Sequence, residues 1–338
     1  MIWMLLKLEV YMKNALLFLL LLPLGINASE IDSFTRRYEP LDDSSAIINK
    51  RTNEYLQEAI KRSNAQGTCH KETLYKEIRK DFNIILNKGT FIQEIVSSDQ
   101  IPKHIISRTD SIFKYHKITD GYLLARPAAD MDGIGIGTTM NFNGHYIGSD
   151  KFEHMWGQGY HYFRRFYYKG FTIKRVLYVG LANERLHLGG NPIATGVYTP
   201  ADLVANFQGM RFWNHLLNEG PDLLGEELGP YIACEGDQWK LVKEVDFRNY
   251  IDAGFDEAYN CSMIVTKSGL RGVKKALVEL NLKDPHNLYT CPLDLDEIKN
   301  VRKKYEVTIG GFTGGTIADY LFNPWYEITG YKFFWWLR

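Results

Sequence analysis

The stretch that decides the fold is residues 149–213, which read SDKFEHMWGQGYHYFRRFYYKGFTIKRVLYVGLANERLHLGGNPIATGVYTPADLVANFQGMRFW. Apolar residues recur at helical spacing from Ser149 onward and again over about 171–187. The glycine-rich residues 189–192 end the second run, and an extended segment, 193–198, follows it. A third helix is predicted after Thr199, because threonine can cap a helix and the next residue, a proline, fits the first helical position.

Glu184 lies on the apolar stripe of the second predicted helix, in line with Leu177, Leu181 and Leu188. Desolvation in such a surround raises the pKa of a carboxyl group, so the group keeps its proton near neutral pH. A protonated carboxylic acid at neutral pH is what a general acid requires. The alternative is a buried structural glutamate that pairs with Arg185 or another base.

Glu153 is the second acidic candidate, and it shares a helical stripe with Trp156, Gly157 and Tyr160. Glycine is a poor helix former, so Gly157 and Gly159 indicate close approach by another helix or by a ligand. The alternative for Glu153 is an acidic residue of a first turn, which the helix dipole favours there.

The rest of the chain predicts one mainly α domain with a small β region over residues 29–338. Two helices are expected within 53–86, separated at 64–67, and one helix or two short ones within 91–118. Short strands are expected within 122–147. Further helical patterns cover 200–217, 269–280, 294–304 and 316–321.

Residues 1–28 are typical of a signal peptide, with an apolar run over 15–22 and a cleavage site after Ala28. That run is too short to span a membrane, so we expect a secreted or periplasmic bacterial protein with no stable membrane span. Removal of Lys7, Lys13 and Glu9 leaves 38 basic and 39 acidic residues. A near-neutral mature chain gives no electrostatic reason to expect a nucleic-acid partner.

The four cysteines, Cys69, Cys234, Cys261 and Cys291, remain after cleavage. An even number in an exported chain favours two disulfides, for which three connectivities are possible. We expect one bonded pair among the last three cysteines, with Cys69 fastening the N-terminal region. The spacings match no zinc pattern.

No metal or other cofactor is expected. Asp150, His154 and His161 share a helical face, but the two histidines are two turns, or about 10.5 Å, apart. His154 is instead expected to bond Asp150 or Glu153 in the interior. Nucleophilic catalysis is not supported either, because the chain has no G-x-S-x-G segment.

The order of these parts resembles the lysozyme and lytic-transglycosylase superfamily. The resemblance consists of a helix ending near Glu184, the glycine-rich extended segment 189–198, and a helix with the pattern N-x-x-G-x-x-aromatic over 206–213. It implies a modified lysozyme-like fold with N- and C-terminal elaborations. The chain looks closest to an exported lysozyme branch of predatory bacteria that attacks de-acetylated peptidoglycan with two glutamates, which map here to Glu184 and Glu153.

The resemblance implies a peptidoglycan glycosidase that works as a monomer on glycan strands. Glu184 would protonate the leaving oxygen, and Glu153 would stabilise the developing positive charge or activate water. Residues expected to bind the sugar rings are Trp156, Tyr160, Thr195, Tyr198 and Asn206. Open alternatives are acetylated or de-acetylated glycan, hydrolysis or transglycosylation, and retention or inversion. The rival hypothesis is a non-catalytic envelope scaffold or glycan-binding protein.

Overall fold

The computed structural model describes residues 29–82, 89–121, 135–186, 195–310 and 314–330. About 47% of the described residues are helical and 11% are in strands, which confirms the prediction of a mainly α protein with a small β region. The predicted signal peptide, 1–28, lies outside the described residues. Among the described helices, none has the length and apolar character needed to cross a membrane.

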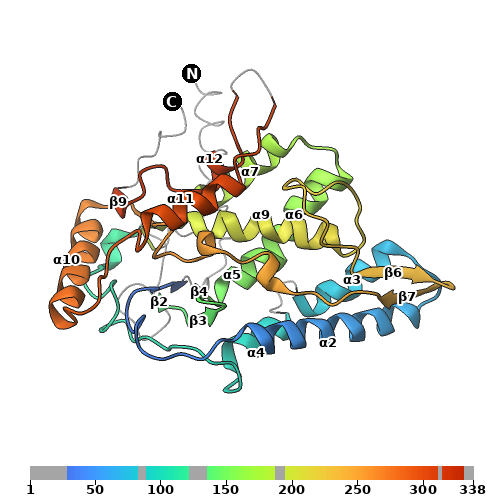
Figure 1. Ribbon diagram of the computed structural model, residues 1–338, viewed down its shortest axis with the longest axis horizontal. Helices are drawn as coiled ribbons and strands as arrows, with labels where there is room; N and C mark the ends of the chain where they lie inside the picture. The colour runs from blue at the N-terminus through green and yellow to red at the C-terminus, as the bar shows by residue number, and fades with distance from the viewer. Residues whose placement is uncertain (1–28, 83–88, 122–134, 187–194, 311–313, 331–338) are drawn as a thin grey trace, which may run out of the picture.

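The structure is built around α9 (Pro200–His215), the predicted third helix, which runs through the middle of the molecule (Figure 1). All sixteen of its residues are buried. Pro200 occupies the first turn as predicted, but the side chain of Thr199 makes no capping hydrogen bond. Because α9 is enclosed on every side, its polar residues must find partners inside the protein.

The predicted first helix is a continuous helical stretch in which α-helical and π-helical turns alternate. It comprises α5 (Asp150–Glu153), η2 (His154–Gln158), α6 (Gly159–Phe163) and η3 (Arg164–Tyr168). It crosses α9 where two glycines meet: a Cβ added to Gly159 would lie 2.6 Å from the Cα of Gly209. The prediction that Gly159 marks close approach by another helix is therefore confirmed.

Three N-terminal helices, α2 (Ser45–Asn64), α3 (Lys71–Phe82) and α4 (Thr90–Ser97), lie along one side of this pair, with α2 forming one long edge of the molecule (Figure 1). The predicted stripes of α2 and α3 are buried, as Leu56 and Ile78 show. The split at 64–67 is confirmed, whereas 91–118 holds one short α-helix, α4, followed by turns and the start of the 3-10 turn η1 (Ile118–Asp120).

The β structure consists of small, separate sheets. Within the described residues β1 (Ser29–Glu30) pairs in parallel with β2 (Gly135–Ile136), and β3 (Thr139–Phe142) forms a hairpin with β4 (His145–Gly148). Asn143 and Gly144 turn that hairpin with positive φ angles of 51° and 90°, as an Asn-Gly turn requires. The hairpin of β6 (Ile232–Glu235) and β7 (Gln238–Leu241) was not predicted. A three-stranded sheet has the order β5 (Val197–Tyr198), β8 (Met263–Ile264), β9 (Thr329–Gly330).

Of the α-helices in the described residues, those not yet named are α7 (Ile173–Leu186), α10 (Lys267–Lys283), α11 (Leu295–Lys304) and α12 (Ala318–Leu321). Short 3-10 turns occur at η4 (Phe247–Asn249) and η5 (Ala253–Phe255). The helix α10 lies at the end of the molecule opposite the β6–β7 hairpin, and α7 lies near α12 (Figure 1). The predicted second helix, 171–187, corresponds to α7.

Two disulfides fasten the chain. Cys69 bonds Cys234, joining the α2–α3 connection to β6, and Cys261 bonds Cys291. Both halves of the prediction are confirmed: one pair forms among the three C-terminal cysteines, and Cys69 fastens the N-terminal helices.

Candidate active site

Ionisable side chains from several elements meet in the interior where α5, α7 and α9 come together. We call this group the buried charge cluster. Its members are Glu30, Asp150, Lys151, His154, Glu184, Asp202 and Glu257, and the neutral amide of Asn206 forms hydrogen bonds within it. Burial of so many charged groups is costly unless they are paired, so the arrangement calls for a specific account.

Lys151 occupies the centre of the cluster and is 1% exposed. Its ammonium group donates to Asp150 at 2.9 Å, to Asp202 at 2.7 Å and to Glu257 at 2.8 Å. Burial alone would lower the pKa of Lys151, but these three carboxylates raise it well above the ordinary value. Lys151 is therefore a fixed internal cation that joins α5 to α9 and to the segment around Glu257.

His154 lies one turn after Asp150 and bridges two helices. Its Nδ1 lies 3.1 Å from Oδ1 of Asn206 and 3.5 Å from Oε1 of Glu184, and its Nε2 lies 3.5 Å from Oδ2 of Asp202. Burial lowers the pKa of His154, but Asp202 and Glu184 outweigh it and raise the pKa to about 9. These partners of His154 lie on α7 and α9, and the expected bond within its own helix, to Asp150 or Glu153, stays a prediction. The imidazole of His154 therefore points from its own helix toward α7 and α9.

Glu184 lies near the C-terminal end of α7 and is 4% exposed. Asn206 donates to its Oε1 at 3.1 Å. Burial raises the pKa of Glu184 to about 7, aided by the charge of Asp202 and opposed by His154. The predicted raised pKa and its cause, burial, are confirmed, but the carboxyl group has polar partners, Asn206 and His154, and Leu188 lies outside the described residues. Its basic partner is His154, whereas the guanidinium of Arg185 lies over the ring of Tyr198.

Two further carboxyl groups of the cluster also have raised pKa values. Burial raises the pKa of Glu257 to about 7, against the pull of Lys151, and raises the pKa of Glu30 well above its ordinary value. Glu30 accepts a hydrogen bond from Thr195, and Glu257 accepts one from Ser262. Thr195 therefore contributes to this buried network through Glu30.

The predicted sugar-binding aromatic residues lie in the core. Trp156 is 0% exposed, with its ring stacked on Phe91 at 4.9 Å and the ring of Phe82 edge-on at 4.8 Å. A ring enclosed in this way has no face for a sugar, so the prediction for Trp156 is wrong. Tyr160 and Tyr198, and with them Thr195, are buried as well. The aromatic residues that suggested a sugar-binding wall instead fill the space between helices.

Of the predicted site residues, the structure brings Glu184 and Asn206 together. Glu153 is half-buried at the end of α5, and its pairing with Glu184 stays a prediction. The carboxylate whose charge most strongly raises the pKa of Glu184 is Asp202. Sequence reasoning missed Lys151, Glu30, Glu257 and Asp202 as site residues.

Asp150, His154 and Asp202 form the group best suited to a metal ion among the described residues, since one ligand atom of each lies within 4.8 Å of the others. Both carboxylates, however, already accept from Lys151, and His154 must lose its proton before it can ligate. The side chains present therefore fit an internal ammonium group better than a divalent ion. His161 is not in the group; burial and Arg165 lower its pKa to about 4.

Comparison with known proteins gives no family. No protein-family model, curated protein or solved structure matches the chain. The resemblance to lysozymes therefore stays a prediction, and function has to be argued from the cluster itself. The cluster offers carboxyl groups that exchange protons near neutral pH, held in place by α7, α9 and a buried lysine, which is the equipment of general acid–base chemistry.

Proposed function

We propose that this chain is an exported peptidoglycan glycosidase in which Glu184 is the general acid. The observation that carries the proposal is a buried carboxyl group that Asn206 fixes, where burial raises the pKa of Glu184 to about 7. At neutral pH a substantial fraction of Glu184 holds its proton, ready for transfer to a leaving glycosidic oxygen. The two disulfides suit export to an oxidising compartment.

Asn206 acts as the positioning residue for this acid. Its amide nitrogen donates to Oε1 of Glu184, and its amide oxygen lies within hydrogen-bond distance of His154. The amide therefore fixes the rotamer of the carboxyl group without adding charge to the site. The imidazole of His154 lies next to Glu184, and Asp202 lies on the far side of that ring. These two groups set the electrostatic surroundings of Glu184.

Glycoside hydrolysis requires a second carboxylate, and two candidates remain. Glu153 is the residue that the resemblance implies. Asp202 is the residue that the geometry favours, because it lies across His154 from Glu184 and its charge raises the pKa of the acid. Glu153→Gln and Asp202→Asn distinguish the two candidates. Replacement of the true second carboxylate should lower turnover by about a hundredfold or more.

One observation favours a second function, that of a non-catalytic envelope scaffold. Glu184 is 4% exposed, so a glycan needs access to a carboxyl group that is closed from solvent. In a scaffold the buried charge cluster would serve only to fix the relative positions of α5, α7 and α9. The two functions differ in what Glu184→Gln does to the protein.

The test is digestion of purified peptidoglycan, native and chemically de-acetylated, by the wild type, by Glu184→Gln and by the control Glu58→Gln. The side chain of Glu58 is 59% exposed on α2. Muropeptides are analysed by mass spectrometry. The proposal expects release by the wild type and the control, and loss of release in Glu184→Gln with the fold retained.

The products then resolve the open alternatives. New reducing ends indicate hydrolysis, anhydro ends indicate transglycosylation, and the better substrate shows which glycan is preferred. If the wild type releases nothing from either wall, the enzyme proposal is wrong and the scaffold remains. Equal release by Glu184→Gln and the wild type would remove Glu184 from the mechanism.

A further inference from the structure

A separate pocket of about 710 Å³ opens away from the residues assigned to catalysis. Three parts of the chain line it: the arm at 37–42 that follows β1, the β3–β4 hairpin at Gly144 and Tyr146, and the segments that carry Tyr259 and Leu293. Glu184, His154 and Asp202 are not among its lining residues. The pocket is therefore separate from the proposed catalytic site.

Arg37 forms the floor of the pocket and is held from behind by a buried ion pair with Asp256. The guanidinium of Arg37 donates to both oxygens of Asp256, at 3.1 Å and 2.8 Å, and to the carbonyl of Ser33. The carboxylate of Asp256 also accepts from the backbone N–H groups of Tyr146 and Ala258. Arg37 is thus neutralised and held rigidly, with no spare charge for an anionic ligand.

Two tyrosines frame this floor. The Arg37 guanidinium lies 4.9 Å from the ring centroid of Tyr146 and 5.5 Å from that of Tyr259. A third tyrosine, Tyr38, is 43% exposed at the edge, where its hydroxyl donates to the carbonyl of Leu288. Fixed aromatic rings beside the carboxylates of Glu39 and Asp42 provide both a flat apolar surface and hydrogen-bonding groups.

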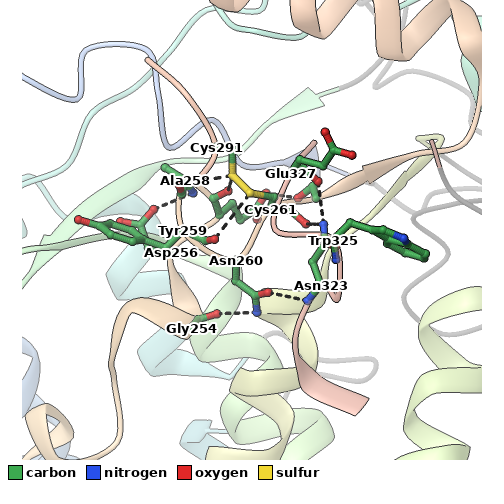
Figure 2. The surroundings of a disulfide bond; sticks show 12 residues. Gly254, Asp256, Ala258, Tyr259, Asn260, Cys261, Cys291, Asn323, Trp325 and Glu327 are labelled. Atoms are coloured by element: carbon green, nitrogen blue, oxygen red, sulfur yellow. Dashed lines mark hydrogen bonds between the residues drawn. A yellow bond between two sulfur atoms is a disulfide. The ribbon is translucent and has the colours of Figure 1, made fainter. Parts of the chain in front are cut away.

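The pocket wall is braced by the disulfide between Cys261 and Cys291. The sulfur of Cys291 lies 3.4 Å from the carbonyl oxygens of Glu257 and Ala258, beside the segment that carries Tyr259. Figure 2 shows Tyr259 extending to one side of this disulfide and Trp325 to the other. Because the wall is cross-linked, its aromatic surface is in place before a ligand arrives, which lowers the entropic cost of binding.

We propose that this pocket binds a saccharide at a site separate from Glu184. Sugar rings present flat apolar faces to tyrosines, and their hydroxyls can donate to the carboxylates of Glu39 and Asp42 at the rim. A nucleotide fits worse, because the rim carries the exposed carboxylates of Glu39 and Asp42 while Arg37 is already paired. The site takes a neutral or amino-bearing oligosaccharide and holds glycan whether or not the chain cleaves it.

The test uses the whole protein carrying Glu184→Gln, so that any cleavage does not obscure binding. Tri-N-acetylchitotriose and its fully de-acetylated counterpart are titrated by isothermal calorimetry. Tyr146→Ala and Tyr38→Ala are then compared with Tyr115→Ala, a partly exposed tyrosine outside the pocket that pairs with Glu279. Circular dichroism establishes that each variant is folded.

Binding of either trisaccharide, weakened about tenfold by Tyr146→Ala or Tyr38→Ala and unchanged by Tyr115→Ala, supports the proposal. Two results overturn it: neither sugar binds the parent protein, or binding occurs and neither pocket variant weakens it. Should Tyr146→Ala fail to fold, Tyr38→Ala decides the question. Binding here is measured without turnover, so its failure is distinct from failure of the glycosidase proposal.

Discussion

Replacement of Glu184 by glutamine should change how stability depends on pH. The wild-type carboxyl has a pKa raised from 4.5 to about 7 in the folded protein. A carboxyl group with a raised folded pKa contributes stability that is fully present below pH 4.5 and is lost as the pH rises through 7. Glutamine keeps an oxygen that can accept from Asn206 but cannot ionise.

The size of the effect follows from the shift. A difference of 7 − 4.5 pKa units corresponds to about 3 kcal/mol of unfolding free energy, most of it lost between pH 5 and pH 8. Glu257 titrates over the same range. The pKa of His154 is raised from 6.5 to about 9, so the stability that His154 contributes is lost as the pH rises from 6.5 through 9. Both remain in the variant, so subtracting the two stability curves isolates the contribution of Glu184, apart from its coupling to His154.

The assay is urea unfolding at half-unit steps from pH 5 to pH 8, with disulfides intact, for the wild type, Glu184→Gln and Glu58→Gln. We expect the wild type and the Glu58 control to run parallel, since Glu58 is exposed on α2. From pH 5 to pH 8 the free energy of unfolding of Glu184→Gln should fall by about 2 to 3 kcal/mol less than that of the wild type. If all three curves are parallel, Glu184 does not titrate in this window and the reasoning for a general acid at position 184 is refuted.

Three further predictions concern stability. Lys151→Met leaves buried carboxylates without their cation and should lower the free energy of unfolding in urea by about 3 to 5 kcal/mol. Lys61→Met, at an exposed side chain on α2, should lower it by under about 1 kcal/mol. Gly159→Ala pushes α6 away from α9 and should lower the free energy of unfolding by about 1 to 3 kcal/mol. Gly310→Ala, where the added Cβ has nothing within 4 Å, should be near neutral, and equal effects of the two substitutions would contradict the close crossing of α6 and α9. Removal of the disulfide that spans 165 residues, by Cys69→Ser with Cys234→Ser, should cost about 5 kcal/mol, against about 4 kcal/mol for the pair spanning 30 residues, and the reverse order in thermal unfolding would rule out loop entropy as the cause.

The local part of the fold could be predicted because it depends on residues near one another in sequence. The stripe of Leu177, Leu181 and Glu184 gave α7 and the desolvated carboxyl, and the residues around Pro200 gave the start of α9. The hairpin turn at 143–144 was equally local. These predictions required no knowledge of which helix packs on which.

The burial of Trp156 could not be predicted in the same way. A tryptophan on a helical stripe looks the same whether its ring faces a cleft or the core. Its depth is decided by Phe82 and Phe91, which lie more than sixty residues earlier and close over the ring. The π-helical turns of η2 and η3 likewise leave no pattern that a 3.6-residue period detects.

The buried charge cluster shows why its membership depends on tertiary structure. Asp150 and Asp202 are balanced by the two cations, Lys151 and His154, which they contact or approach. The remaining carboxyl groups, Glu30, Glu184 and Glu257, all have raised pKa values. Protons on these three groups bring the cluster close to neutrality, which is the condition for burying so many ionisable groups at all. Burial makes the protonated form of Glu184 the favoured one in the folded protein, and a carboxyl group that holds a proton near neutral pH can give it to a substrate.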